Sequence, residues 1–304
     1  MLNRYNYKNL KWVDLESPTR EEIDHLREEF GVPGPVSDEL LTATVRSKVD
    51  LHDGMIYLVL HFPKMVGVDN EQSDQEIDFI LGKDFLITTH YEGSKPMKDF
   101  AKMLELDTLL NKKKMNDDHA VFLFFELMKL LYRNSQEELE SINDLLRDLE
   151  SRIYSGKEEQ TVYLISKVNR ILLDFRQAIR YHLETLKSFE DAAKAFYGDR
   201  FEYYLNSMIS EYNKLQNKLD GHKEILNDLR ETNDSLITTK TNSTVKTLTA
   251  MSFILLPLSL IASIFGMNVE FSLIKDMADL WFVVGGMVVL GIIMYIFFKL
   301  KKWV

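Results

Sequence analysis

The chain has 304 residues, and its 47 acidic residues outnumber 37 basic ones to give a net charge of −10. It contains no cysteine, which excludes disulfide bonds and thiolate zinc sites. The acidic balance disfavours nucleic acid as a partner and favours cations, although the same balance also keeps an ordinary domain soluble.

Residues 1–112 mix short helix and strand signals, which predicts an α/β domain. A charged helix is expected from Thr19 to Phe30. Ser17-Pro18 marks its start, and Gly31-Val32-Pro33-Gly34-Pro35 marks its end, because proline and glycine interrupt helices.

Two β-hairpins are predicted after this helix. Lys48 to Phe62 alternates apolar and polar residues in part around Asp53-Gly54. Glu76 to Thr89 follows a similar pattern around Gly82-Lys83-Asp84. These hairpins predict a small sheet.

Residues 113–240 contain no proline and few glycines, a composition typical of long helices. Apolar residues at helical spacing predict a helix from Asp118 to Tyr154, and Val162 to Phe196 is expected to form a second one. A third is predicted from Phe201 to about Phe265, with a break near Gly221 or Asn242 as the alternative. Asp117-Asp118-His119 is interpreted as a helix cap rather than a metal site.

The C-terminal residues 241–304 hold two uncharged runs, Thr247 to Val269 and Leu280 to Phe298. A bilayer-spanning helix needs about 20 predominantly apolar residues, so both runs are long enough to span. We therefore expect a transmembrane hairpin, with a first helix over 241–266 and a second span over 280–298. The predicted fold class is an α/β N-terminal cytoplasmic domain, long α-helices, and this two-helix hairpin.

Lysine positions set the expected orientation. Lys240 and Lys246 precede the first span, and three lysines follow the second. The loop between the spans is acidic. Because basic residues favour the cytoplasmic side, both termini are expected in the cytoplasm, with the loop outside the cell membrane. The acidic residues of this loop are Glu270, Asp276 and Asp279.

A seam of mostly small or polar residues follows the first span at alternating spacings of three and four. Lipid-facing positions gain nothing from hydroxyl groups, so this face is expected to meet another helix or water. Two spans cannot enclose a pore, so a water-filled seam requires several copies around an axis. The seam residues are Asn242, Val245, Thr249, Ser252, Leu256, Ser259, Ser263 and Gly266.

The tip of the hairpin reads Gly266-Met267-Asn268, and in this position the tripeptide resembles the signature of the CorA family of magnesium channels. The resemblance covers the whole plan of the chain. Thr241-Asn242, Lys246, Leu248-Thr249 and Pro257-Leu258 also match that family's pore helix without a gap.

The resemblance implies a homopentamer in the inner membrane that conducts Mg²⁺, with Co²⁺ or Ni²⁺ as further ions. Gly266, Met267 and Asn268 would select the ion at the outer mouth. Asn242 would form an inner polar ring, with Val245 and Leu248 as an apolar gate and Leu256 as a second constriction. Thr249, Ser252, Ser259 and Ser263 would line the pore.

Neutral oxygen ligands suit this role, because Mg²⁺ sheds its water reluctantly and must also be released. The outer loop departs from the family pattern: Val269 stands where Phe is usual, and Phe271 to Leu280 lacks a Met-Pro-Glu-Leu stretch. Glu270 is retained, and Asp276 and Asp279 are candidates for attracting cations.

Closure by intracellular Mg²⁺ is also implied by the resemblance, through carboxylates at subunit interfaces. Asp38 and Glu39 occupy the position of the family's acidic pair. The usual partner falls at Ser207, so Glu202 and Glu211 are its candidate replacements, with plain surface charge as the alternative.

Two alternatives remain for function. Zinc transporters share this plan, and a non-conducting membrane-anchored helical sensor would need no pore. No metalloprotease motif, phosphate loop or nucleophile motif is present, so neither an enzyme nor an organic cofactor is predicted.

Overall fold

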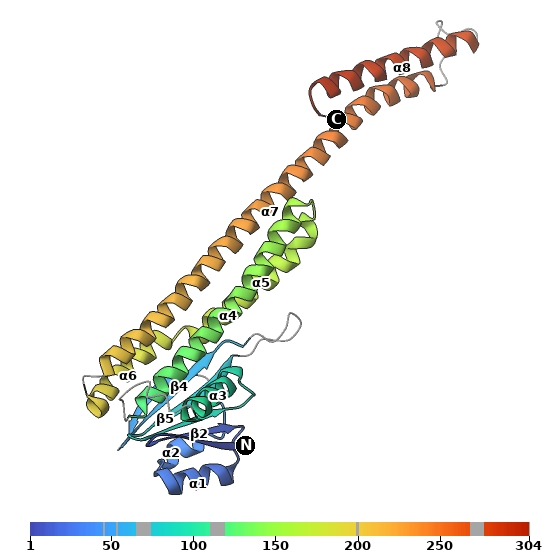
Figure 1. The fold of residues 1–304 in the computed structure, drawn as a ribbon. Helices are drawn as coiled ribbons and strands as arrows, with labels where there is room; N and C mark the ends of the chain where they lie inside the picture. The colour runs from blue at the N-terminus through green and yellow to red at the C-terminus, as the bar shows by residue number, and fades with distance from the viewer. Residues whose placement is uncertain are drawn as a thin grey trace. The chain divides into compact units, whose positions relative to one another are not determined.

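The computed structural model describes residues 1–44, 46–52, 54–64, 74–109, 119–198, 201–267 and 277–303. The chain divides into two compact units (Figure 1). The first contains Met1–Arg152 and Val162–Leu229, and the second contains Ile153–Thr161 and Arg230–Val304. The three-part division at residues 112 and 240 stays a prediction.

A six-stranded sheet forms the base of the first unit. Its order is β1-β2-β6-β5-β4-β3, with β2 and β6 parallel and the other neighbours antiparallel. Both predicted hairpins are confirmed, β3 with β4 and β5 with β6. The strands are β1 (Leu2–Tyr7), β2 (Leu10–Glu16), β3 (Lys48–His52), β4 (Met55–Phe62), β5 (Gln75–Leu81) and β6 (Phe85–His90).

The sheet is larger than the sequence patterns indicate, because β1 and β2 carry little apolar alternation. Strand β1 reads LNRYNY and is mostly polar, as suits an edge strand. Strand β2 places a buried acid, Asp14, among its apolar residues. The position of β2 in the sheet therefore depends on its pairing with β6, which lies more than seventy residues away in sequence and leaves no local signal.

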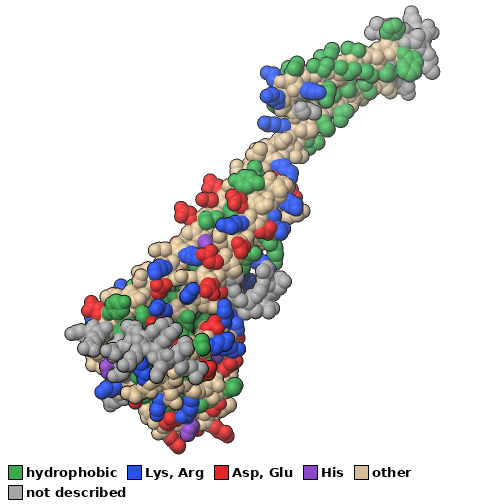
Figure 2. Space-filling model, viewed as in Figure 1, with side chains coloured by type: hydrophobic (Ala, Val, Ile, Leu, Met, Phe, Trp, Pro, Cys, Tyr) green, Lys and Arg blue, Asp and Glu red, His purple; other side chains and the backbone are tan. Residues whose placement is uncertain are grey.

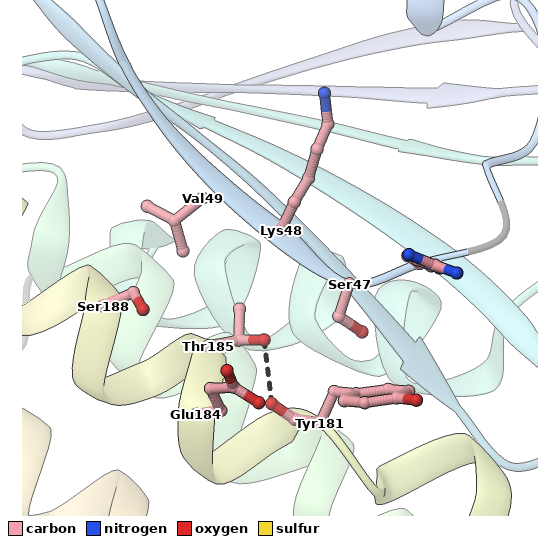
Figure 3. A pocket seen from close by; sticks show the side chains of 8 residues that line it. Ser47, Lys48, Val49, Tyr181, Glu184, Thr185 and Ser188 are labelled. Atoms are coloured by element: carbon pink, nitrogen blue, oxygen red, sulfur yellow. Dashed lines mark hydrogen bonds between the residues drawn. The ribbon is translucent and has the colours of Figure 1, made fainter.

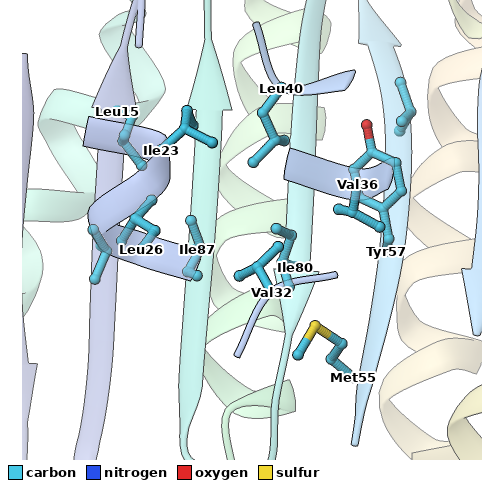
Figure 4. Close-up of a cluster of buried hydrophobic side chains, with 12 residues drawn as sticks. Leu15, Ile23, Leu26, Val32, Val36, Leu40, Met55, Tyr57, Ile80 and Ile87 are labelled. Atoms are coloured by element: carbon cyan, nitrogen blue, oxygen red, sulfur yellow. The ribbon is translucent and has the colours of Figure 1, made fainter. Parts of the chain in front are cut away.

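One face of the sheet packs against α1 (Arg20–Phe30) and α2 (Gly34–Glu39). Ile23, Leu26 and Val36 lie over Ile80 and Ile87 in one buried cluster (Figure 4). The predicted bounds of α1 are confirmed: Thr19 and Glu22 form a capping box, and Gly31 ends the helix with a φ of 69°.

Helices also cover the opposite face, since successive side chains of a strand point to opposite sides. Trp12 packs its ring edge against Phe100 of α3 (Lys95–Leu109), and Phe79 packs against Phe124 of α4 (Val121–Tyr154). The sheet is thus buried between two helical layers.

The segment predicted as one helix from Val162 to Phe196 is two helices. Helix α5 (Glu158–Ile179) ends before α6 (His182–Tyr197) begins. No glycine or proline marks the break, so the cause is tertiary. The buried His182 ring bonds to the backbone carbonyl of His61, and Tyr181 accepts bonds from both Thr185 N and Thr185 Oγ1.

Helix α7 (Phe201–Phe265) is continuous, which confirms the long helix and excludes the break near Gly221 or Asn242. Its C-terminal part lies in the second unit with α8 (Met277–Leu300), which contains the predicted second span. Both helices are long and apolar enough to cross a membrane. Pro257 lies inside α7, as membrane helices tolerate.

Candidate functional site

The polar seam runs along the part of α7 that belongs to the second unit. Helix α8 contacts α7 mainly elsewhere: Phe253 lies 6.3 Å from Phe298 between ring centroids, and a side chain at Gly291 would touch Leu258. Ala250 is fully buried. These contacts lie off the seam, so pairing of the two helices does not require the seam's polar residues.

Seam hydroxyls are turned toward their own helix. Thr249 Oγ1 donates to Val245 O at 2.8 Å, Ser252 Oγ to Leu248 O at 2.9 Å, and Ser259 Oγ to Leu256 O at 3.0 Å. Each hydroxyl has one proton and two acceptor lone pairs. Because the proton is donated to a backbone carbonyl, the hydroxyl oxygen can only accept a further hydrogen bond. This suits the water molecules around a cation, since those waters donate their hydrogen bonds outward.

The predicted gate residues are exposed apolar side chains in the isolated chain. Val245 is 54% exposed, and Leu248 and Leu256 are each 65% exposed. Asn242 and Ser263 are exposed as well, and Thr249 is partly buried. In the isolated chain, α7 therefore exposes both polar and apolar side chains along this part of its surface.

At the tip, Gly266 ends α7 and Met267 follows in a turn. Gly266 N bonds to Ala262 O at 2.9 Å, and an added Cβ at Gly266 would lie 3.2 Å from that same oxygen. A larger residue would therefore crowd the last turn. Asn268, Glu270 and Asp276 lie outside the described residues, and Asp279 is described only as part of α8.

The predicted regulatory acids of α2 each have a basic partner within the first unit. Asp38 binds Arg20 at 2.7 Å, and Glu39 binds Lys48 at 2.5 Å. Burial disfavours the charged Lys48, but its bonds to Glu39 and Asp50 outweigh that effect and raise the pKa of the ammonium group. Both carboxylates are therefore already neutralised within the chain.

Two of the predicted regulatory acids lie on α7: Glu211 is paired, and Glu202 is exposed. Lys214 lies 2.6 Å from Glu211, and this hydrogen bond lowers the pKa of that carboxyl. Across the described residues, no group of three or more His, Asp or Glu side chains is placed to hold a metal. The four predicted regulatory residues thus form no complete metal site within this part of one chain.

Other candidates also carry no converging ligand set. A cavity of about 380 Å³ lies between β3 and α6 and is lined by Ser47, Tyr181, Glu184 and Thr185, among others (Figure 3). Lys48 lines it through its stem only, because its ammonium group binds Glu39. Asp117 and Asp118 lie outside the described residues, while the His119 ring lies 6.0 Å from that of Tyr197.

Buried polar groups in the sheet were missed by sequence reasoning. His61 and Glu76 are opposite each other on β4 and β5, and Glu76 accepts bonds from Thr44 N at 2.6 Å and Thr44 Oγ1 at 3.0 Å. Burial raises the pKa of nearby Asp78 to about 8. A polar pair at matching positions of two predicted strands is the signal that would have indicated them.

Comparison with known proteins adds independent information. Residues 7–301 match the family model for the CorA-like Mg²⁺ transporter protein. The cobalt/magnesium transport protein CorA of Thermotoga maritima is 24% identical over 96% of this chain and 83% of its own length. The putative metal ion transporter YfjQ of Bacillus subtilis is 23% identical over 96% of this chain and 89% of its own length.

A solved structure also shares the fold. The complete CorA magnesium transporter from Methanocaldococcus jannaschii superposes with a TM-score of 0.85, at 18% identity, over 97% of this chain and 92% of the other.

Proposed function

Because the chain belongs to the CorA-like Mg²⁺ transporter family, we propose that it is a channel that passes Mg²⁺ into the cytoplasm. Co²⁺ and Ni²⁺ are further candidate ions. The names of its relatives support divalent cation transport. The two long apolar helices support a location in the membrane.

The observation that carries the proposal is the set of inward-bonded hydroxyls on the seam. Thr249, Ser252 and Ser259 present acceptor oxygens while their protons are used by the helix backbone. A hydrated Mg²⁺ ion offers donors in every direction and dehydrates reluctantly. A ring of neutral acceptors therefore passes the hydrated ion without binding it too tightly to leave.

Selectivity is assigned to the outer mouth, formed by Gly266, Met267 and Asn268, and to an inner ring at Asn242. Glu270, Asp276 and Asp279 attract cations from outside. A single seam cannot enclose a pore, so the channel is an oligomer. The resemblance to the CorA family implies a homopentamer in the inner membrane, and the lysine positions favour the cytoplasm for both termini. The membrane potential then drives inward flow, at about 4.6 kcal/mol per 100 mV for a divalent ion.

Flux of Mg²⁺ into liposomes that contain the purified protein and an internal Mg²⁺ dye tests this function. Wild-type protein is expected to conduct, and Asn268→Ala to lose most selectivity for Mg²⁺ over Zn²⁺. Asn217→Ala is the matched control, since Asn217 is an exposed amide of α7 in the first unit. Absence of flux through wild-type oligomer would favour the anchored sensor, and a preference for Zn²⁺ would favour a zinc transporter.

A further inference from the structure

One end of the membrane hairpin carries five lysines and no acidic residue of its own. The sequence holds no Asp or Glu from Ser235 to Val269 or from Leu280 onward. Lysines lie at the corresponding end of both helices, and Figure 2 shows them gathered where the apolar surface of the hairpin stops. They are Lys240, Lys246, Lys299, Lys301 and Lys302.

These lysines differ in whether they are already paired. Lys240 lies 3.4 Å from Glu158 and is neutralised by it. Within the part of the chain that the structure describes, Lys246, Lys301 and Lys302 are exposed and have no acidic partner. Lys299 lies 5.9 Å from the ring centroid of Tyr295, which leaves its charge available. Among the described residues, four ammonium groups at one end of the hairpin therefore have no acidic side chain within salt-bridge distance.

The C-terminal turn places Lys301 and Lys302 beside α7. Trp303 N bonds to Phe298 O at 3.0 Å and Lys302 N to Lys299 O at 3.1 Å, the two bonds of a Schellman motif. The Trp303 ring packs 5.8 Å from that of Phe298, and Thr247 Oγ1 lies 3.5 Å from the Trp303 carbonyl. This turn therefore holds the segment that carries the two lysines against α7 at Thr247, the residue after Lys246, rather than leaving it as a free tail.

Lys302 itself occupies a position where glycine is favoured. Its φ is 56°, in the left-handed region that side chains with a Cβ rarely adopt. A glycine there would form the same turn with less strain, so the turn does not explain the lysine.

We propose that Lys246, Lys299, Lys301, Lys302 and Trp303 form a docking surface for the headgroups of anionic phospholipids. Ammonium groups at the edge of an apolar span lie at the depth of lipid phosphates, and a tryptophan favours the same depth. Charge complementarity selects lipids with a net negative headgroup over zwitterionic ones. The proposal requires that the hairpin is in a membrane, but it does not require ion conduction.

Fluorescence quenching by brominated lipids tests this surface directly. In a Trp281→Phe background, Trp303 is the tryptophan of the hairpin, and Trp12 is buried in the first unit. The full-length protein is reconstituted in phosphatidylcholine vesicles that contain either brominated phosphatidylglycerol or brominated phosphatidylcholine at equal mole fraction. We expect phosphatidylglycerol to bind beside Trp303 roughly fivefold more strongly, the effect of about one lysine at such a surface.

Variants separate charge from fold. Lys246→Gln/Lys301→Gln/Lys302→Gly removes three of the four charges while the glycine favours the same turn, and it should remove most of the preference, with Lys299 retained. The corresponding triple Arg variant should keep the preference. Lys83→Gln/Lys187→Gln/Lys223→Gln, which changes three lysines of the first unit, should leave it unchanged. High salt should reduce the preference of the wild type by screening.

Two outcomes would overturn the proposal. One is equal quenching by both brominated lipids with wild-type protein. The other is a preference for phosphatidylglycerol that is as strong in the triple Gln/Gly variant as in the wild type. Because neither readout depends on Mg²⁺ flux, a failure here is distinguishable from a failure of the channel function.

Discussion

His182 on α6 donates a hydrogen bond of 2.8 Å from Nε2 to the backbone carbonyl of His61 on β4. A carbonyl can only accept, so Nε2 carries the proton. In a neutral ring Nδ1 is then an acceptor, and it lies 3.0 Å from the hydroxyl of Tyr132 on α4. One uncharged imidazole therefore joins two helices to the sheet.

This arrangement makes the first unit sensitive to acid. Burial lowers the pKa of His182 from 6.5 to about 4. A depressed pKa stabilises the folded state above pH 6.5, and this contribution is lost as pH falls toward 4. We expect a loss on the order of 3 kcal/mol over that range, at about 1.36 kcal/mol per pKa unit.

The measurement is urea unfolding of the first unit at several pH values, followed by the fluorescence of Trp12. His182→Gln cannot titrate, yet its amide can still donate to the His61 carbonyl. The difference in stability between wild type and His182→Gln should therefore shrink between pH 6.5 and 4. If the difference stays constant over this range, the ring is not held neutral as described.

Core packing beneath the sheet gives a second prediction. Leu26 of α1 is buried between α1 and the sheet. Leu26→Ala should lower the free energy of unfolding by about 2 to 5 kcal/mol, through lost burial and the cavity left behind. Leu51→Ala is the control, because Leu51 is 56% exposed and its loss should change stability by less than about 0.5 kcal/mol.

The sequence predicted the elements that have local signals. Ser17-Pro18 precedes α1 and Gly31 follows it, so this helix was found with nearly correct bounds. The break between α5 and α6 was not found, because it depends on His182 reaching a strand more than a hundred residues away. No pattern of neighbouring residues contains that information.

In the candidate site, too, some features follow from local sequence and others depend on tertiary contacts. The seam is a property of spacing along one helix, so the sequence alone identifies it, and its role in lining a pore stays a prediction. The ion pair between Asp38 and Arg20 joins α2 to α1. It depends on how these two helices pack, which the spacing of residues along the sequence does not show. Sequence reasoning therefore identified the carboxylates but not their neutralisation.

That neutralisation leads to a third prediction, about closure by internal Mg²⁺. If Asp38 contributes to a regulatory site between subunits, Arg20 competes with the metal for it. Arg20→Gln should then lower the internal Mg²⁺ concentration that halves the flux, by roughly fivefold for a pair worth about 1 kcal/mol. Asp38→Asn should raise that concentration.

Opposite shifts for these two variants are the informative result, because either substitution removes the same ion pair. Flux through liposomes at graded internal Mg²⁺ provides the measurement. Arg133→Gln is a control, since Arg133 is exposed and pairs with Glu137 on α4 instead. Equal shifts in one direction would mean that the pair has only a structural role.

The predicted gate yields the last prediction. Val245 and Leu248 are exposed apolar side chains next to hydroxyl-bearing seam positions. In a narrow pore, rings of such side chains exclude water and so block ions. Val245→Ser and Leu248→Ser should each admit water and raise Mg²⁺ flux at high internal Mg²⁺, where the wild type is expected to be closed. Met251→Ser is the matched control, because Met251 is also apolar and 51% exposed but lies on a different face of α7 from Val245 and Leu248. An increase in flux for the control as large as for the gate variants would show that the barrier lies elsewhere.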